Sequence, residues 1–219
     1  MIAVRNLGVS VGPVSILENV SFEAAAGSVV GIVGHNGAGK TTLMRAIVGV
    51  LPPVRGQVLF EGVDVTHAPT QQRVRWGMGY MPEDRRLVPD LSVRANILLP
   101  MELNGVADRN RRLDQVLTLI PELVPLIDRR GNQLSGGQQK LAALARAIGY
   151  GHRLLLLDEP FEGVAPALVA RLTGVLRDLR ANGPTVIVTD SEGANLNGLC
   201  DVRLRIERGR VELDQETHA

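Results

Sequence analysis

Glycines and one lysine near residue 40 form the stretch whose chemistry is most evident. Residues 34–42 lie between an apolar run at 29–33, which predicts a buried strand, and a run at 43–48, which predicts a helix. A strand, a glycine loop, Gly-Lys-Thr and a helix are the arrangement that a phosphate-binding loop requires. The residues expected to contact phosphate are Gly34, His35, Asn36, Gly37, Ala38, Gly39, Lys40, Thr41 and Thr42.

Each part of this loop has a physical role. The three glycines allow backbone conformations closed to other residues, so that N–H groups can point into one concavity, and the helix N-terminus adds positive partial charge. Lys40 can reach the β- and γ-phosphates, and the Thr41 hydroxyl can bind Mg²⁺. The alternative is a glycine-rich turn with a chance lysine, which the flanking strand and helix disfavour.

Two carboxylates follow a second apolar run. Leu154–Leu157 predicts a buried strand, and Asp158 and Glu159 come directly after it. Ligands of parallel sheets bind at the carboxyl ends of strands. Asp158 is therefore expected to hold Mg²⁺, directly or through water, and Glu159 to orient and deprotonate an attacking water. Alone, the pair would be an ordinary acidic turn.

A third motif precedes a predicted helix over 138–150. It consists of Leu134, then Ser135, Gly136 and Gly137, then Gln138. Ser135 can cap the helix while its hydroxyl and the glycine N–H groups bind phosphate. By itself the stretch could be only a glycine-rich helix cap.

Composition narrows the classes of protein. The chain has 219 residues, 45% of them hydrophobic, which is ample for a core. A net charge of +1 gives no sign of nucleic-acid binding, and one cysteine excludes an internal disulfide and a cysteine zinc site. Its N-terminus lacks the order of a signal peptide, and no uninterrupted apolar run approaches the length of a membrane span.

Hydrophobic patterning predicts an α/β fold. Alternation at Val9 and Val11, and at Val20 and Phe22, indicates half-buried N-terminal strands. Further expected strands are 56–62, 77–81 and 185–188, with a hairpin over 202–213; expected helices are 66–76, 92–104, 108–120 and 166–181. Strands that alternate with helices predict a mainly parallel sheet with helices on its faces. The helical segments within about 84–135 are expected to form a small insert in a single domain over 1–219.

The three motifs together resemble the ATP-binding cassette (ABC) family over the whole chain. This resemblance implies an ATPase with the P-loop fold of ABC type: a mainly parallel core sheet, N-terminal antiparallel strands and a small helical subdomain. It also implies that two such subunits enclose two ATP molecules with Mg²⁺. The phosphate loop of one subunit then faces the Ser135 stretch of the other.

Three further segments look like the branched-chain amino acid importer ATPases of the LivF type. They are residues 80–86, 89–96 and 158–166, and related importers of urea and short amides share these patterns. The resemblance implies integral membrane permease subunits as partners and a second ABC ATPase, either a paralogue or another copy of the chain. A periplasmic or extracellular substrate-binding protein would act indirectly. The expected location is the cytoplasmic face of the inner (plasma) membrane.

The chain departs from the family pattern at three positions. Glu83 stands where most relatives have glutamine, a change that the LivF type commonly carries. Val11 stands where most have an aromatic residue on the adenine, so we expect weaker nucleotide binding. Asp190 aligns with a histidine or glutamine at the γ-phosphate. A carboxylate there would repel phosphate unless protonated or bridged by Mg²⁺, so we expect slow turnover.

Two rival functions stay open at this point. One is an ABC ATPase that serves no transporter, such as a factor of cofactor assembly or DNA repair. The other is a regulatory subunit that binds ATP and hydrolyses it poorly, which Val11 and Asp190 would suit.

Overall fold

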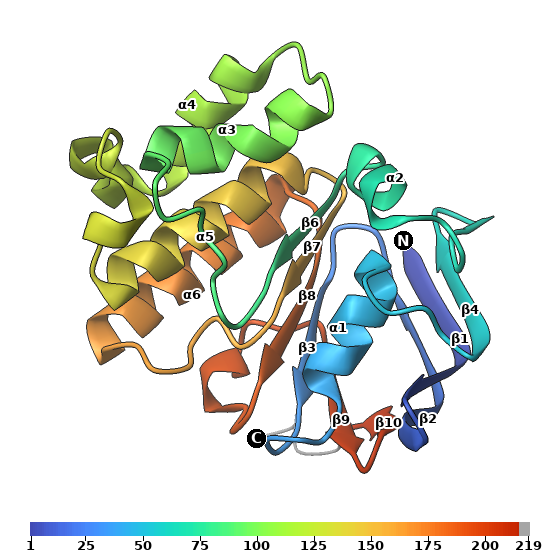
Figure 1. Cartoon of the computed structure of the whole chain (residues 1–219). Coiled ribbons are helices and arrows are strands. Elements are labelled where there is room, and N and C mark those ends of the chain that lie inside the picture. The colour runs from blue at the N-terminus through green and yellow to red at the C-terminus, as the bar shows by residue number, and fades with distance from the viewer. Residues whose placement is uncertain (215–219) are drawn as a thin grey trace.

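Two β-sheets lie on opposite sides of helix α1 (Lys40–Val48) (Figure 1). The computed structural model describes residues 1–214, without the side chains of residues 181 and 182. The smaller sheet is antiparallel and has the strand order β2-β1-β4-β5. Its strands are β1 (Ile2–Val11), β2 (Val14–Ala24), β4 (Arg55–Phe60) and β5 (Val63–Asp64).

The larger sheet has the order β10-β9-β3-β8-β7-β6 and is parallel except for its edge strand β10. Because each parallel strand returns through a crossover, strands distant in sequence become neighbours. The strands are β3 (Val29–Val33), β6 (Met78–Met81), β7 (Leu154–Leu157), β8 (Thr185–Asp190), β9 (Val202–Glu207) and β10 (Arg210–Leu213).

Helices cover the larger sheet and extend beyond it. Helices α5 and α6 lie on the face opposite to α1, and α3 and α4 pack beyond α5 (Figure 1). The remaining helices described are α2 (Thr70–Arg75), α3 (Val93–Leu103), α4 (Arg109–Leu119), α5 (Gly136–Tyr150), α6 (Pro166–Asn182) and the 3₁₀ turns η1 (Pro121–Leu126), η2 (Gly131–Gln133) and η3 (Ala194–Leu196).

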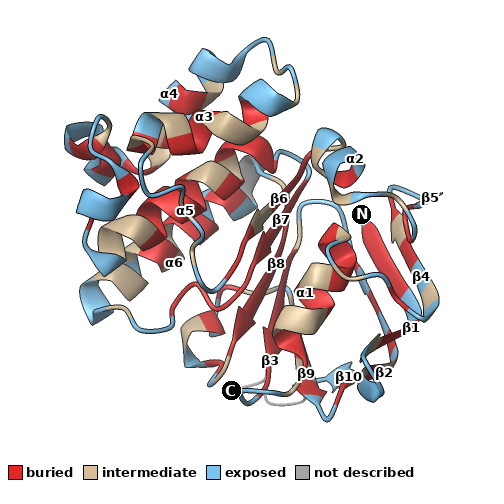
Figure 2. Cartoon of the chain, viewed as in Figure 1, coloured by how far each residue is buried: buried red, intermediate tan, exposed pale blue. Residues whose placement is uncertain are grey.

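Both faces of the larger sheet are buried, as Figure 2 shows. Alternate residues of β7 enter different cores: Leu155 and Leu157 pack toward α5 and α6, while Leu154 and Leu156 pack toward α1 and the smaller sheet. A strand buried on both faces needs a continuous apolar sequence, which explains the run of four leucines. The polar residues that follow are consequently held at the edge of a rigid layer.

Two buried polar side chains fix the segments around this core. Asn96 has no exposed surface, and its amide donates to three carbonyls and accepts from the Val88 N–H group, which joins α3 to the preceding loop. Arg73 is 1% exposed and donates to main-chain carbonyls that include Ala46 and Ile47 at the last turn of α1. A cation at a helix C-terminus also meets the negative end of the helix dipole.

The expected fold class is confirmed. A mainly parallel core sheet, antiparallel N-terminal strands and a group of helices between β6 and α5 are all present. Over the described residues, the helices are too short or too polar to cross a bilayer.

Candidate active site

The carboxyl ends of three adjacent strands bring the predicted motifs together. Strand β8 lies between β3 and β7, so the phosphate loop after β3, Asp158 and Glu159 after β7, and Asp190 at the end of β8 meet at one edge. Parallel strands converge in this way because all their carboxyl ends face the same side. The phosphate loop, the two carboxylates after β7 and Asp190 therefore lie together, whereas the Ser135 stretch is not part of this group.

Glycines shape the phosphate loop for two different reasons. Gly37 and Gly39 have φ angles of 83° and 114°, which side chains disfavour. Gly34 has no positive φ; a Cβ there would lie 2.3 Å from the carbonyl oxygen of Ile206 on β9. Contrary to the expectation that all three glycines are needed for their φ angles, Gly34 is needed for close packing against a neighbouring strand.

Lys40 lies at the centre of the site and is 5% exposed. Its ammonium donates to the carbonyls of Gly34 and His35, the latter at 3.0 Å. It also forms an ion pair with Glu159, 3.0 Å from Oε1. Two nearly buried charges of opposite sign thus compensate each other between the segments that follow β3 and β7.

Asp158 is fully buried, and its carboxylate accepts hydrogen bonds from hydroxyl groups on two neighbouring strands. Thr189 donates to Oδ1 at 3.1 Å, and Tyr80 donates to Oδ2 at 3.3 Å. Burial raises the pKa of Asp158, while hydrogen bonds from Thr41, Thr189 and Tyr80 oppose that shift. A buried carboxylate next to the Thr41 hydroxyl is a donor pair that suits Mg²⁺, which takes one or two protein ligands together with phosphate oxygens and water.

Glu159 is held from several directions. Its N–H group donates to Thr189 Oγ1 at 2.8 Å, and its Oε1 lies 2.8 Å from the Ser191 hydroxyl as well as near Lys40. The main chain at Glu159 has a φ of 49°, an uncommon conformation for a residue with a side chain. The sequence patterns pointed to neither Thr189 nor Ser191, because each joins the site only through strand pairing.

Asp190 turns its carboxylate toward the following loop. It accepts from the Gly193 N–H group at 2.9 Å and from the Asn195 amide. Burial raises its pKa, and the charge of Glu159 acts in the same direction. The neighbouring Ser191 hydroxyl is the group that contacts Glu159 and Asn36. A direct role of Asp190 at the γ-phosphate stays a prediction.

A cavity of about 440 Å³ opens over the phosphate loop. Its lining residues are Ile16, Asn36, Gly37, Gly39, Lys40, Thr41, Thr42, Glu83 and Glu159. Glu83 is one of these lining residues, and burial with neighbouring carboxylates raises its pKa. Ile16 also lines the cavity, although no sequence motif pointed to it. Val11 does not line it; this residue pairs with Val14 in β1–β2 and is 54% exposed.

The Ser135 stretch begins α5 with a reciprocal cap. The Ser135 hydroxyl accepts from the Gln138 N–H group, and the Gln138 side chain accepts from the Ser135 N–H group. Ser135 and Gly136 are exposed, and neither they nor Gly137 and Gln138 line the cavity as described. In Figure 1 this end of α5 is well separated from α1.

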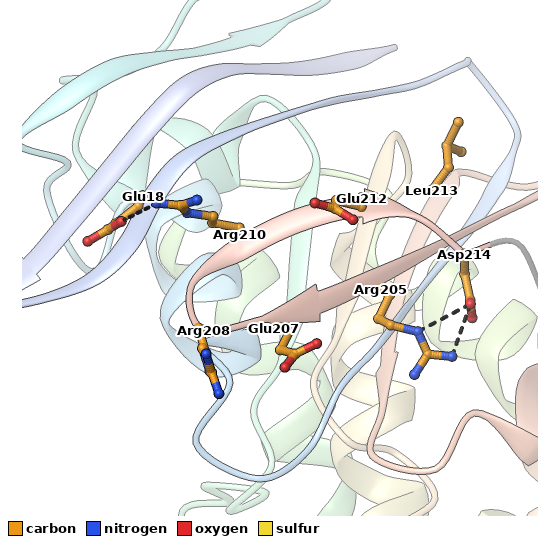
Figure 3. A pocket seen from close by; sticks show the side chains of 8 residues that line it. All are labelled: Glu18, Arg205, Glu207, Arg208, Arg210, Glu212, Leu213 and Asp214. Atoms are coloured by element: carbon orange, nitrogen blue, oxygen red, sulfur yellow. Dashed lines mark hydrogen bonds and ion pairs between the residues drawn. The ribbon is translucent and has the colours of Figure 1, made fainter.

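A larger hollow of about 940 Å³ lies at the β9–β10 hairpin (Figure 3). Four of its charged side chains form ion pairs within the hollow: Arg205 with Asp214, and Arg210 with Glu18 at 3.2 Å. None of the predicted phosphate-loop or carboxylate residues lines this hollow.

Comparisons with known proteins identify the family. Residues 17–162 match the family model of ABC transporters. The chain is 36% identical over 198 residues to the lipopolysaccharide export system ATP-binding protein LptB of Acidithiobacillus ferridurans, covering 90% of this chain and 82% of that protein. It is 32% identical over 200 residues to the high-affinity branched-chain amino acid transport ATP-binding protein BraG of Pseudomonas aeruginosa, covering 91% and 86%.

A solved ATP-binding cassette of an ABC transporter in its ADP conformation has the same fold. It superposes with a TM-score of 0.85 at 25% identity, covering 97% of this chain and 89% of that one. The chain therefore belongs to the ABC transporter family, and it is an ATP-binding ATPase of that family. The predicted family is confirmed, while the LivF-type assignment stays a prediction.

The buried Asp158 generates a prediction about pH and stability. Because its pKa is raised in the folded chain, the ionised form opposes folding, and this cost grows as pH rises above the ordinary aspartate value. In EDTA we expect Asp158→Asn to unfold at a higher temperature than the wild type at pH 8. The difference should shrink at pH 3.8, the ordinary aspartate value, where the unfolded chain also begins to bind the proton. A difference that is the same at both pH values contradicts this account.

Proposed function

We propose that the site formed by β3, β7 and β8 hydrolyses ATP with Mg²⁺, and that hydrolysis drives a membrane permease. The observation that carries the proposal is the Lys40–Glu159 pair, with 3.0 Å between Nζ and Oε1 inside a cavity above a phosphate loop. In this pair, a cation that can bind phosphate lies next to a carboxylate that can accept a proton from water.

The phosphate loop and the lysine would bind the triphosphate. Lys40 would exchange its bonds to the Gly34 and His35 carbonyls for β- and γ-phosphate oxygens. Thr41 and Asp158 would hold Mg²⁺, which neutralises phosphate charge when bound.

Glu159 would act on the attacking water. Once Lys40 binds phosphate, one oxygen of Glu159 is released from the ion pair and can accept a proton from water. Thr189 and Ser191 keep the carboxylate at the edge of the cavity while this happens. Catalysis of this kind is positioning and electrostatics and needs no covalent intermediate.

A second ATPase subunit would complete the site. The capped Ser135 stretch is exposed and offers N–H groups at a helix N-terminus, yet it lies away from the cavity of its own chain. Two subunits facing each other would bring Ser135, Gly136, Gly137 and Gln138 onto the nucleotide of the partner. The partner would be another copy or a paralogue.

An apolar groove supports a permease as the further partner. It has a volume of about 340 Å³ and is lined by residues of α1, α2, β6, α3 and α5, with Arg45, Arg86 and Arg146 around it. Leu103, one of its lining residues, is 73% exposed. Exposed apolar groups rimmed by charge are typical of protein interaction sites. Docking there would hold the chain at the cytoplasmic face of the inner membrane.

Two kinds of cargo are supported by different relatives. Import of branched-chain amino acids or related amides such as urea is supported by the LivF-type segments and by the likeness to BraG. It would involve an external substrate-binding protein indirectly. Lipopolysaccharide export is supported by the 36% identity to a relative named for that system. The permease would decide between them, because it carries the cargo path.

The role of Glu159 can be tested directly. We expect Glu159→Gln to lower kcat for ATP hydrolysis by about 10²- to 10⁴-fold, the usual worth of a general base, while ATP affinity is retained. Glu162→Gln is the matched control, because this exposed carboxylate belongs to the same turn and does not line the cavity. Wild-type turnover by Glu159→Gln would refute the proposed mechanism.

Co-purification from gently solubilised native membranes tests the transport role. We expect the tagged chain to bring down permease subunits and an ABC ATPase, and the identity of the permease to distinguish import from export. Leu103→Asp should lose the permease, whereas Leu213→Asp, at a side chain 72% exposed on β10, should keep it. A chain recovered only from the soluble fraction, alone or with assembly factors, would favour a non-transport ATPase.

A further inference from the structure

The only two lysines of the chain both contact Glu159. Lys40 meets its carboxylate, and Lys140 donates to its main-chain carbonyl at 2.9 Å. Lys140 is 1% exposed and also donates to the Glu162 carbonyl at 2.5 Å. Burying an ammonium is costly unless its N–H groups are hydrogen-bonded, and here two main-chain carbonyls accept those bonds. Both carbonyls belong to the turn that carries Glu159.

The turn that Lys140 binds is conformationally strained. Glu159 has a φ of 49°, and the Glu162 N–H group donates to the Glu159 carbonyl at 3.3 Å. A residue with a side chain in the left-handed region persists only where its surroundings hold it. Lys140 supplies such a hold, because one ammonium joins both ends of the 159–162 turn.

We propose that Lys140 is a positioning residue for ATP hydrolysis, which fixes the main chain of Glu159 so that its carboxylate reaches Lys40 and the attacking water. Lys140 does not itself line the cavity as described and so acts through Glu159. Lys140 belongs to α5, the helix that Ser135 caps. Its hydrogen bonds therefore connect the helix that would face the partner subunit with the turn that carries Glu159. This inference rests on the role proposed above for Glu159.

The test is kinetic and uses Lys140→Met, which keeps an unbranched side chain and removes the donors. We expect kcat to fall at least about tenfold, since small misplacements of catalytic groups cost up to about a hundredfold, while KM and ATP affinity stay within about twofold. In a Glu159→Gln background, single-turnover hydrolysis should not fall further when Lys140→Met is added, because the first change already removes the group that Lys140 positions.

Arg73→Met is the matched control. Arg73 is likewise 1% exposed and donates to main-chain carbonyls, but at the opposite end of α1 from the phosphate loop. It should lower thermal stability and leave kcat per folded molecule unchanged. If Lys140→Met does not fold, Lys140→Gln replaces it. The glutamine keeps N–H donors, but its side chain is shorter, so we again expect kcat to fall while KM stays nearly unchanged.

Two results would overturn the inference. One is wild-type kcat in the Lys140 variant while Glu159→Gln is inactive, which refutes the positioning role and leaves the proposed function standing. The other is an equal loss of kcat in the Lys140 and Arg73 variants, which would reduce Lys140 to a structural role. Wild-type turnover by Glu159→Gln would instead overturn the proposed function itself.

Discussion

The site depends on the compensation of buried charge at the edge of a sheet. Asp158 and Glu159 follow a strand of four leucines and are almost entirely buried, so their negative charge needs partners within the protein or from a ligand. Lys40 is the partner of Glu159, while hydroxyl groups serve Asp158. A phosphate with its metal would therefore bind where a buried cation and buried carboxylates already lie next to each other.

Rigid layers make this compensation possible. Strand β8 joins β3 to β7, and helices cover both faces, so the loops that follow these strands start from fixed points. The 159–162 turn is held on the opposite side by Lys140 of α5. If α5 moved when a partner subunit bound, the Lys140 hydrogen bonds would transmit that movement to the main chain of Glu159.

Much of this arrangement could be predicted from the sequence, because local signals carry it. The glycine loop, the leucine strand and the Ser135 cap depend on residues close together in the chain, and the structure forms each where expected. Contacts between distant segments could not be predicted. Gly34 is required by Ile206, Ser191 reaches Glu159 through strand pairing, and Lys140 in a helix sequence resembles a solvated residue.

The most direct test of the central claim is a structure of Glu159→Gln bound to ATP and Mg²⁺. We expect phosphate oxygens on Lys40 in place of the Gly34 and His35 carbonyls, and the metal on Thr41 and Asp158. We also expect the Ser135 stretch of a second subunit to face the γ-phosphate. A triphosphate bound away from Lys40, or a γ-phosphate enclosed by one chain alone, would contradict the account.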